Sequence, residues 1–123
     1  MEHANDLSQL SARLARFAAE RDWDKFHSPK NLAMALIAEA AELVEHFQWV
    51  SEEESRHPNA TKLAEVRLEL ADIFIYLIRT ATQLDIDLVE AAWEKIELNE
   101  SRYPADKVRG SAARAVEYNK PGN

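Results

Sequence analysis

The sequence predicts an all-α fold, a bundle of four helices joined by short loops. Three observations lead to this prediction. No segment shows the two-residue alternation of apolar and polar residues that marks a half-buried strand. Apolar residues recur instead at spacings of three and four over four long segments. Three of these segments follow a residue whose short polar side chain can cap a helix. Together these features are typical of an all-α domain.

The first helix begins after Asn5 or Asp6, either of which can cap it, and runs to about residue 21. Residues 21–28, RDWDKFHS, then break the apolar pattern and gather aromatic and charged side chains in one loop. We weigh two interpretations of this loop. Its aromatic side chains anchor it to the core, or they form the wall of a pocket, where an aromatic ring stacks on a planar ligand and a His or Lys meets phosphate.

Ser28 followed by Pro29 marks the start of the second helix, because a capping side chain precedes a proline at the first helical position. This helix runs to about residue 50. Residues 51–59 form a polar connector, and the third helix follows at about residues 60–84.

The fourth helix is capped by Asp85 or Asp87 and is closed by Pro104. We predict one domain over residues 1–104, with residues 105–123 as a flexible or loosely docked C-terminal tail. The apolar side chains of the second and third helices cover a wide arc of each helix, wider than the first and fourth helices can bury. We therefore expect a homo-oligomer, in which subunits complete the bundle.

Two acidic pairs lie inside the apolar parts of the second and third helices. AEAAELVEHFQW carries Glu39 and Glu42, and LELADIFIY carries Glu69 and Asp72. A spacing of three places each pair on one face of its helix, and an unpaired carboxylate beside apolar surface is costly. In an antiparallel hairpin with its turn near residues 54–58, all four carboxylates converge on one layer. His46 lies on the same, metal-facing side, and the alternative for this single His is that it only packs or forms hydrogen bonds.

Four carboxylates held together repel each other unless some are protonated or a cation lies among them. An all-oxygen site suits Mg²⁺ or Mn²⁺. Zinc fits poorly because the chain has no Cys and no His at ligand spacing, and a di-iron bundle would need Glu-x-x-His motifs. A single acidic pair at this spacing is usually a solvated surface. Two pairs in matching register favour the metal site.

The composition limits the classes of partner. The net charge of −7 and the pI of about 5.1 argue against nucleic acid or an anionic membrane as the main partner. The absence of Cys, of a long apolar run and of a signal peptide predicts a cytoplasmic protein. Glycine occurs only at Gly110 and Gly122, so phosphate binding would fall to metal and side chains rather than to a Gly-rich loop.

These motifs resemble the MazG-like superfamily of all-α nucleoside triphosphate pyrophosphohydrolases, whose metal motif is E-x-x-E followed after a spacer by E-x-x-D. The segments FAAERDWDKFHSPKNLAMAL, AEAAELVEHFQW, ELADIFIYL and KIELNESRYP resemble its dCTP pyrophosphatase branch in order and spacing, over about residues 10–103. Two positions depart from that branch. Leu14 stands where the branch has a His that helps to hold the substrate, and Ala38 stands where the family has Gly.

The resemblance implies hydrolysis of dCTP or a modified dCTP to the monophosphate and pyrophosphate, a reaction of nucleotide pool sanitation. It also implies a homotetramer and Mg²⁺, with Mn²⁺ as a possible substitute. The implied metal ligands and catalytic residues are Glu39, Glu42, Glu69 and Asp72. The implied substrate-binding residues are Trp23, Asp24, Lys25, Phe26, His27, Trp49, Tyr76, Lys95 and Asn99.

Other functions stay open at this point. The same chemistry could act on dUTP or dATP, because hydrogen bonds to the base decide the choice. The chain could also be a non-enzymatic, metal-binding helical module that forms oligomers. The general base is one of the four carboxylates or Glu45, and the number of metal ions is open. Tyr76, one turn beyond Asp72, is placed to crowd a ribose 2′-hydroxyl.

Overall fold

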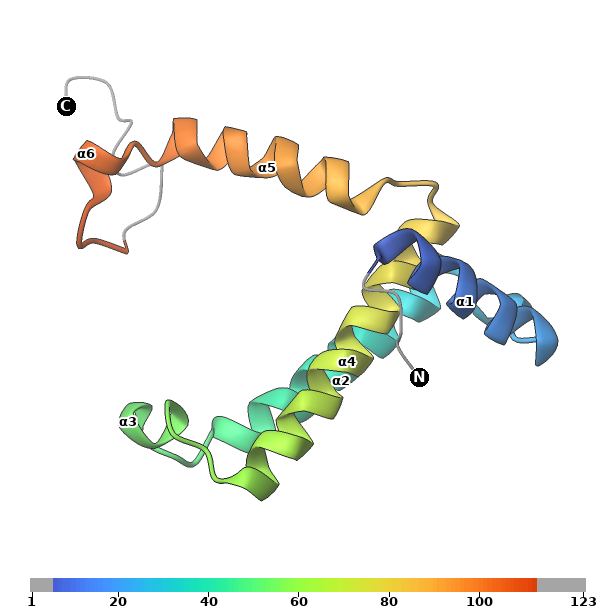
Figure 1. Ribbon diagram of the computed structural model, residues 1–123, viewed down its shortest axis with the longest axis horizontal. Helices are drawn as coiled ribbons and strands as arrows, with labels where there is room; N and C mark the ends of the chain where they lie inside the picture. Colours follow the sequence, from blue (N-terminus) through green and yellow to red (C-terminus); the bar gives the residue numbers. More distant parts are fainter. Residues whose placement is uncertain (1–5, 113–123) are drawn as a thin grey trace. The chain divides into compact units, whose positions relative to one another are not determined.

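The computed structural model describes residues 6–112. Its elements are α1 (Leu7–Glu20), the 3₁₀ turn η1 (Asp24–Phe26), α2 (Pro29–Phe47), α3 (Glu52–Ser55), α4 (Ala60–Gln83), α5 (Leu88–Arg102) and α6 (Ala105–Val108) (Figure 1). No residue in this described part of the chain lies in a strand. The predicted all-α class is therefore confirmed, and the four long helices match the four predicted segments. Within residues 6–112, no helix is long and apolar enough to cross a membrane.

Five helices begin at a polar cap. The side chain of the capping residue accepts a hydrogen bond from a backbone N–H in the first turn at Asp6, Ser28, Ser51, Asn59 and Asp87. The structure thus selects Asp6 and Asp87 from the predicted alternatives, while Asn5 lies outside the described residues. The one-turn helix α3 was not predicted. Its sequence signal is Ser51 followed by three glutamates, because acidic side chains in a first turn stabilise the helix N-terminus.

Two helices are followed by an aspartate with left-handed backbone geometry. Asp22 follows α1 with φ of 55°, and Asp85 follows α4 with φ of 54°. After α1, the N–H of Trp23 donates to the carbonyl of Ala18 over 2.9 Å, and an equivalent bond follows α4. This is the Schellman arrangement, in which glycine is the usual residue at positive φ. The chain therefore turns sharply after α1 and brings the loop of residues 22–28 back toward the helix.

The contacts divide the chain into two compact units, Met1–Ile86 and Asp87–Asn123. In the first unit, α2 and α4 pack side by side as an antiparallel hairpin, and α1 contacts α4 (Figure 1). The second unit contains α5 and α6. Helix α6 falls within the predicted tail, of which residues 113–123 lie outside the described part. The predicted boundary at residue 104 stays a prediction.

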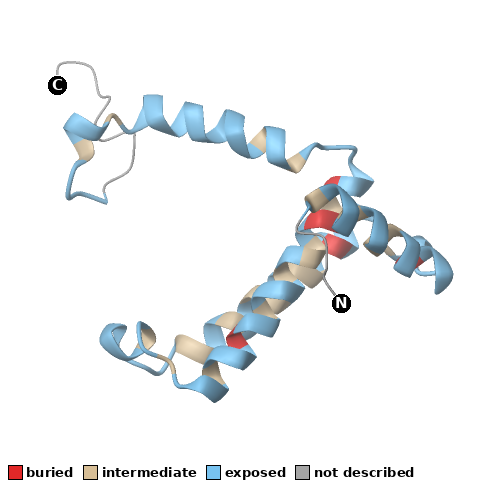
Figure 2. Ribbon diagram, in the orientation of Figure 1, coloured by how far each residue is buried: buried red, intermediate tan, exposed pale blue. Residues whose placement is uncertain are grey.

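The core of the described residues is small. Its buried apolar side chains are Ala18, Leu32, Val66, Ile78 and Ala81. Much of the hairpin surface is exposed (Figure 2), and it includes large apolar side chains on α2 and α4: Met34, Ile37, Val44, Leu63, Leu68, Leu70, Phe74 and Leu77. Exposed apolar surface of this extent is typical of a protein–protein interface. The prediction that the arcs of these two helices are too wide for one chain to cover is consistent with this surface.

Candidate metal centre

Three carboxylates from two helices meet inside the hairpin. Helix α2 supplies Glu39, and α4 supplies Glu69 and Asp72. One oxygen from each side chain lies within 4.8 Å of the others. The two glutamates are partly buried and Asp72 is exposed, so the cluster opens to solvent on one side. Three of the four predicted acids are thus brought together by the antiparallel packing of α2 against α4.

Glu42, the fourth predicted acid, lies next to this cluster and is exposed. Burial first, then hydrogen bonds with Glu42 and Glu69 and the charges of Glu42 and Asp72, raise the pKa of Glu39 to about 7. The pKa of Glu69 is also raised, first by burial and then by Glu42. The four acids therefore form one electrostatic group, in which the protein alone disfavours full ionisation.

Two oxygens of the cluster are buried without a partner. Oε2 of Glu39 and Oε2 of Glu69 accept no hydrogen bond from any described residue. Burying a carboxylate oxygen in this state is costly, because the atom loses water and gains nothing in return. A divalent cation between the helices would supply the missing partner and neutralise the charge. The donor set is all carboxylate, which is the set that hard cations prefer, so these residues fit a divalent metal.

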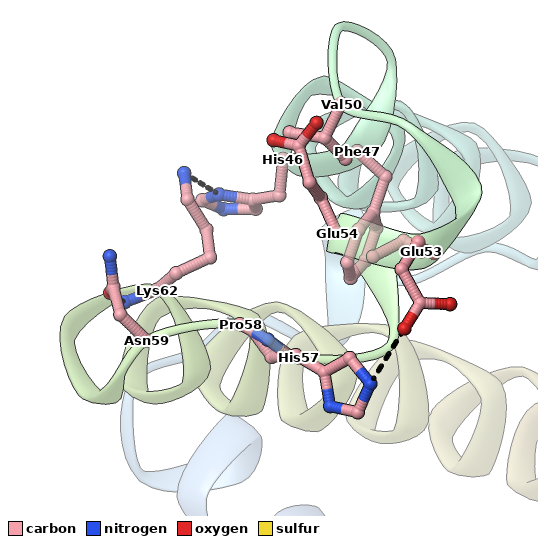
Figure 3. Close-up of a pocket in the computed structure, with 10 residues that line it drawn as sticks. His46, Phe47, Val50, Glu53, Glu54, His57, Pro58, Asn59 and Lys62 are labelled. Atoms are coloured by element: carbon pink, nitrogen blue, oxygen red, sulfur yellow. Dashed lines mark hydrogen bonds and ion pairs between the residues drawn. The ribbon is translucent and has the colours of Figure 1, made fainter.

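His46 does not join this cluster. Its Nδ1 lies 3.2 Å from Nζ of Lys62 and 3.6 Å from Oε2 of Glu65. The His46 and Lys62 side chains meet across the hairpin at the edge of a cavity of about 440 Å³ (Figure 3). None of the four acids lines this cavity, which lies at the turn where α3 joins the two helices. The alternative that His46 only hydrogen-bonds is therefore the correct one.

The loop of residues 22–28, called the Trp23 loop below, is fixed to α4. Nη2 of Arg79 donates to Oδ1 of Asp24 over 3.0 Å. Nδ1 of His27 lies 3.4 Å from Nε and 3.3 Å from Nη2 of the same guanidinium. Nε2 of Gln83 donates to the backbone carbonyl of His27 over 2.8 Å. Burial, and then the charge of Arg79, lower the pKa of His27, so its ring is neutral and Nδ1 can accept.

The other loop side chains face solvent. Trp23 is 44% exposed, and its ring stands edge-on to Phe17 with 5.6 Å between centroids. Phe26 is 58% exposed. Nζ of Lys25 pairs with Oδ2 of Asp22 over 2.9 Å. The Trp23 loop is therefore anchored to α4 through Asp24 and His27, as the first interpretation predicts. Its rings of Trp23 and Phe26 remain exposed, as the second interpretation, a pocket wall, requires.

The remaining predicted substrate-binding residues lie on or near α2, on α4 and on α5. Tyr76 is half-buried on α4, one turn beyond Asp72. Trp49 is 89% exposed just after the end of α2. Lys95 and Asn99 are exposed on α5, which belongs to the second unit.

Sequence reasoning missed Arg79 and Gln83. Arg79 had a signal, since it directly follows the apolar run IFIYLI within the same helix, where a charge needs a partner. The sequence did not indicate which residues would bond to Arg79, because the apolar periodicity of a helix does not show which loop packs against that helix.

Comparisons with known proteins agree with one another. A family model described as the MazG-like family matches residues 35–117. The chain is 45% identical over 111 residues to dCTP pyrophosphatase 1 of Mus musculus, covering 88% of this chain and 65% of that protein. It is 41% identical over 113 residues to dCTP pyrophosphatase 1 of Homo sapiens, covering 90% and 66%. The chain thus spans slightly less than two thirds of these relatives. A crystal structure of a pyrophosphatase from Archaeoglobus fulgidus aligns with a TM-score of 0.77 and 38% identity, over 85% of this chain and 97% of that one.

Proposed function

We propose a function from one premise: the chain belongs to the MazG-like family. On that premise, the chain is a nucleoside triphosphate pyrophosphohydrolase that cleaves dCTP, or a modified dCTP, to the monophosphate and pyrophosphate. The observation that carries this proposal is the acidic cluster of the hairpin, with two buried carboxylate oxygens that have no partner among the described residues. The names of the relatives, dCTP pyrophosphatase 1 and pyrophosphatase, support it.

The proposed metal is Mg²⁺, with Mn²⁺ as a substitute, held by Glu39, Glu42, Glu69 and Asp72. When bound, the cation would supply charge neutralisation for the phosphates and Lewis-acid activation of the reaction. The four carboxylates otherwise repel a triphosphate, so the protein alone binds this substrate poorly. Each of the four carboxylates is a candidate general base. Glu45, exposed on α2 one turn beyond Glu42, is another.

The proposed nucleotide site lies next to the acids. Exposed aromatic rings of Trp23, Phe26 and Trp49 are suited to stack on a base, and Tyr76 is placed for the sugar. Lys25 is suited to phosphate or sugar oxygens, and resemblance to the family adds Lys95 and Asn99 of the second unit as candidates for the same role. Leu14, half-buried on α1, stands where the dCTP branch has a His, so the strength of the preference for cytosine is a property to measure.

The proposed assembly is a homo-oligomer, a tetramer by resemblance to the family. It is supported by the exposed apolar side chains of α2 and α4, which a second copy of the same hairpin would cover. A cytoplasmic location stays a prediction from the sequence.

The experiment that tests the function is pyrophosphate release from a panel of nucleoside triphosphates with Mg²⁺. We expect the natural chain to prefer dCTP and to yield the monophosphate. Glu42→Gln should abolish release, while Glu52→Gln, an exposed glutamate of α3, should leave it unchanged.

Other outcomes would redirect the proposal. A preference for dUTP or dATP would keep the chemistry and change the substrate. No release from any nucleotide by a folded, metal-binding protein would contradict the proposal and favour the non-enzymatic module.

A further inference from the structure

Within residues 6–112, Arg79 is the buried charged residue, with 4% of its surface exposed. Burying a guanidinium is costly unless its N–H groups are bonded, and breaking a buried ion pair by removing one partner is strongly destabilising. The bonds of Arg79 go to the Trp23 loop, to the carboxylate of Asp24 and the ring of His27. The buried guanidinium of Arg79 therefore bonds to a short surface loop rather than to another long helix.

Further hydrogen bonds fix the same loop at both ends of η1. Gln83 donates to the carbonyl of His27 over 2.8 Å, and Nδ2 of Asn31 donates to the carbonyl of Phe26 over 3.1 Å. The N–H of Trp23 donates to the last turn of α1. The loop is therefore tied to α1, α2 and α4, with Arg79 as its only charged and buried tie among the described residues.

Arg79 and the acids share one side of α4. Asp72, Tyr76, Arg79 and Gln83 follow one another at spacings of four, three and four, which places them in one stripe. Seven residues of helix bring Arg79 back to within about 20° of Asp72 and advance it by about 10 Å along the axis. One end of the stripe therefore carries the metal cluster, and the other end carries the Trp23 loop.

The bonds of Arg79 also fix the surroundings of Trp23. The Trp23 indole makes a T-shaped contact with the ring of His27, with 6.5 Å between centroids. It makes a second T-shaped contact with the ring of Phe17. His27 is in turn bonded to Arg79. Trp23 is 44% exposed and contacts both of these rings, so it is a rigid platform for a planar base, because little conformational freedom is lost on stacking.

We propose that Arg79 is a positioning residue for the base-binding end of the site. It holds the Trp23 loop, through Asp24 and His27, at a level of α4 about two helical turns beyond Asp72. Asp24 and His27 then serve the loop and do not contact the nucleotide. This inference rests on the proposed function, because the ligand that it positions is a nucleotide.

The test compares Arg79→Met and Asp24→Asn with Arg67→Met, which changes an exposed arginine of the same helix. Three quantities are measured: steady-state hydrolysis of dCTP, calorimetric affinity for the non-hydrolysable α,β-imido analogue of dCTP with Mg²⁺, and hydrogen exchange over residues 22–28. For Arg79→Met we expect KM and the analogue's Kd to rise by about tenfold, kcat to change by less than about twofold, and exchange in the loop to accelerate. Mn²⁺ affinity without nucleotide should equal that of the natural chain.

Two further variants keep the result interpretable. Asp24→Asn removes the charge from the half-exposed partner and should reproduce part of the KM effect even where Arg79→Met folds poorly. The double variant should be no worse than Arg79→Met, since both changes act on one contact. Arg79→Lys, which keeps the charge but loses the planar fork, should recover part of the affinity.

Three results would overturn the inference: unchanged exchange in the loop, faster exchange with unchanged KM and Kd, or a parallel loss of kcat and Mn²⁺ affinity. The proposed function fails separately. If the natural chain binds the analogue but releases no pyrophosphate, the function is wrong, and the inference is judged on the analogue's Kd in the variants. If it binds no nucleotide, both are wrong.

Discussion

Glu39 of α2 and Glu69 of α4 lie opposite each other in the hairpin, each with a buried Oε2 atom that no described residue bonds. The fold alone does not relieve this arrangement, since burial, and then the neighbouring acids, raise the pKa of both side chains. It is the clearest sign that the hairpin is built to hold something positively charged.

The first prediction concerns stability against pH without metal. The pKa of Glu39 is raised from its ordinary 4.5 to about 7 in the folded protein, so the folded state holds more protons between these values. The stabilising contribution of this group is complete below about pH 4.5 and is lost as the pH rises through about 7. We expect the Tm in EDTA to fall from pH 5 to pH 8, and the slope to flatten in Glu39→Gln. An equal slope in both proteins would contradict this.

The second prediction concerns metal binding. Ligand carboxylates must lose their protons, so metal binding should release protons and strengthen between pH 6 and pH 8. Mg²⁺ should raise the Tm more at pH 8 than at pH 6, because the gain grows with the ratio of ion concentration to Kd. Calorimetry in two buffers of different ionisation enthalpy measures the released protons. Glu52→Gln should behave as the natural chain, and a pH-independent Mg²⁺ effect in Glu39→Gln alone would support Glu39 as the titrating ligand.

The third prediction concerns the sugar. Tyr76 is half-buried one turn beyond Asp72, where it would crowd a 2′-hydroxyl. Tyr76→Ala should reduce the ratio of kcat/KM for dCTP to that for CTP by about tenfold, the size of effect that loss of a shaped contact produces. Tyr76→Phe, which keeps the ring, should retain most of the ratio. An unchanged ratio in Tyr76→Ala would rule out this contact.

The fourth prediction concerns the backbone after α4. Asp85 has φ of 54°, a geometry that costs a residue with a Cβ about 1 kcal/mol relative to glycine. Asp85→Gly should therefore raise the free energy of unfolding by a few tenths to about 1 kcal/mol, net of the greater freedom of glycine in the unfolded chain. Asp85→Val should lower it, because a β-branched residue is poorly tolerated there. Urea titration of the three proteins gives the order.

The fifth prediction concerns assembly. Ile37 is 65% exposed on α2, beside other exposed apolar side chains. A charge in an apolar interface is costly, so Ile37→Glu should shift the protein to a smaller species in light scattering after size exclusion. Lys30→Glu changes an exposed residue of the same helix and should leave the mass unchanged. A natural chain that is monomeric at all concentrations would contradict the proposed oligomer.

The acidic cluster could be predicted because two simple regularities determine it. A spacing of three sets one face of a helix, and the equal distance of Glu39 and Asp72 from the turn sets their level in the hairpin. The caps at Asp6, Ser28 and Asp87 followed from local chemistry in the same way.

Contacts between distant segments could not be predicted in this manner. The bonds of Arg79 to Asp24 and His27 join residues more than fifty positions apart, and no periodicity relates them. The sequence placed His46 on α2, but it did not show that the side chain contacts Lys62 and Glu65 of α4 instead of the acids. One-turn helices such as α3 are too short to produce a period at all.

The metal cluster and the stripe that leads to the Trp23 loop belong to one hairpin of helices that are consecutive long elements of the chain. Helical topologies, in which most contacts are local, fold within microseconds to milliseconds. A nascent chain that has released α4 therefore holds every acid of the centre. If the acids bind metal as proposed, capture can begin at that stage of synthesis, and it would favour the closed hairpin before the later segments are made.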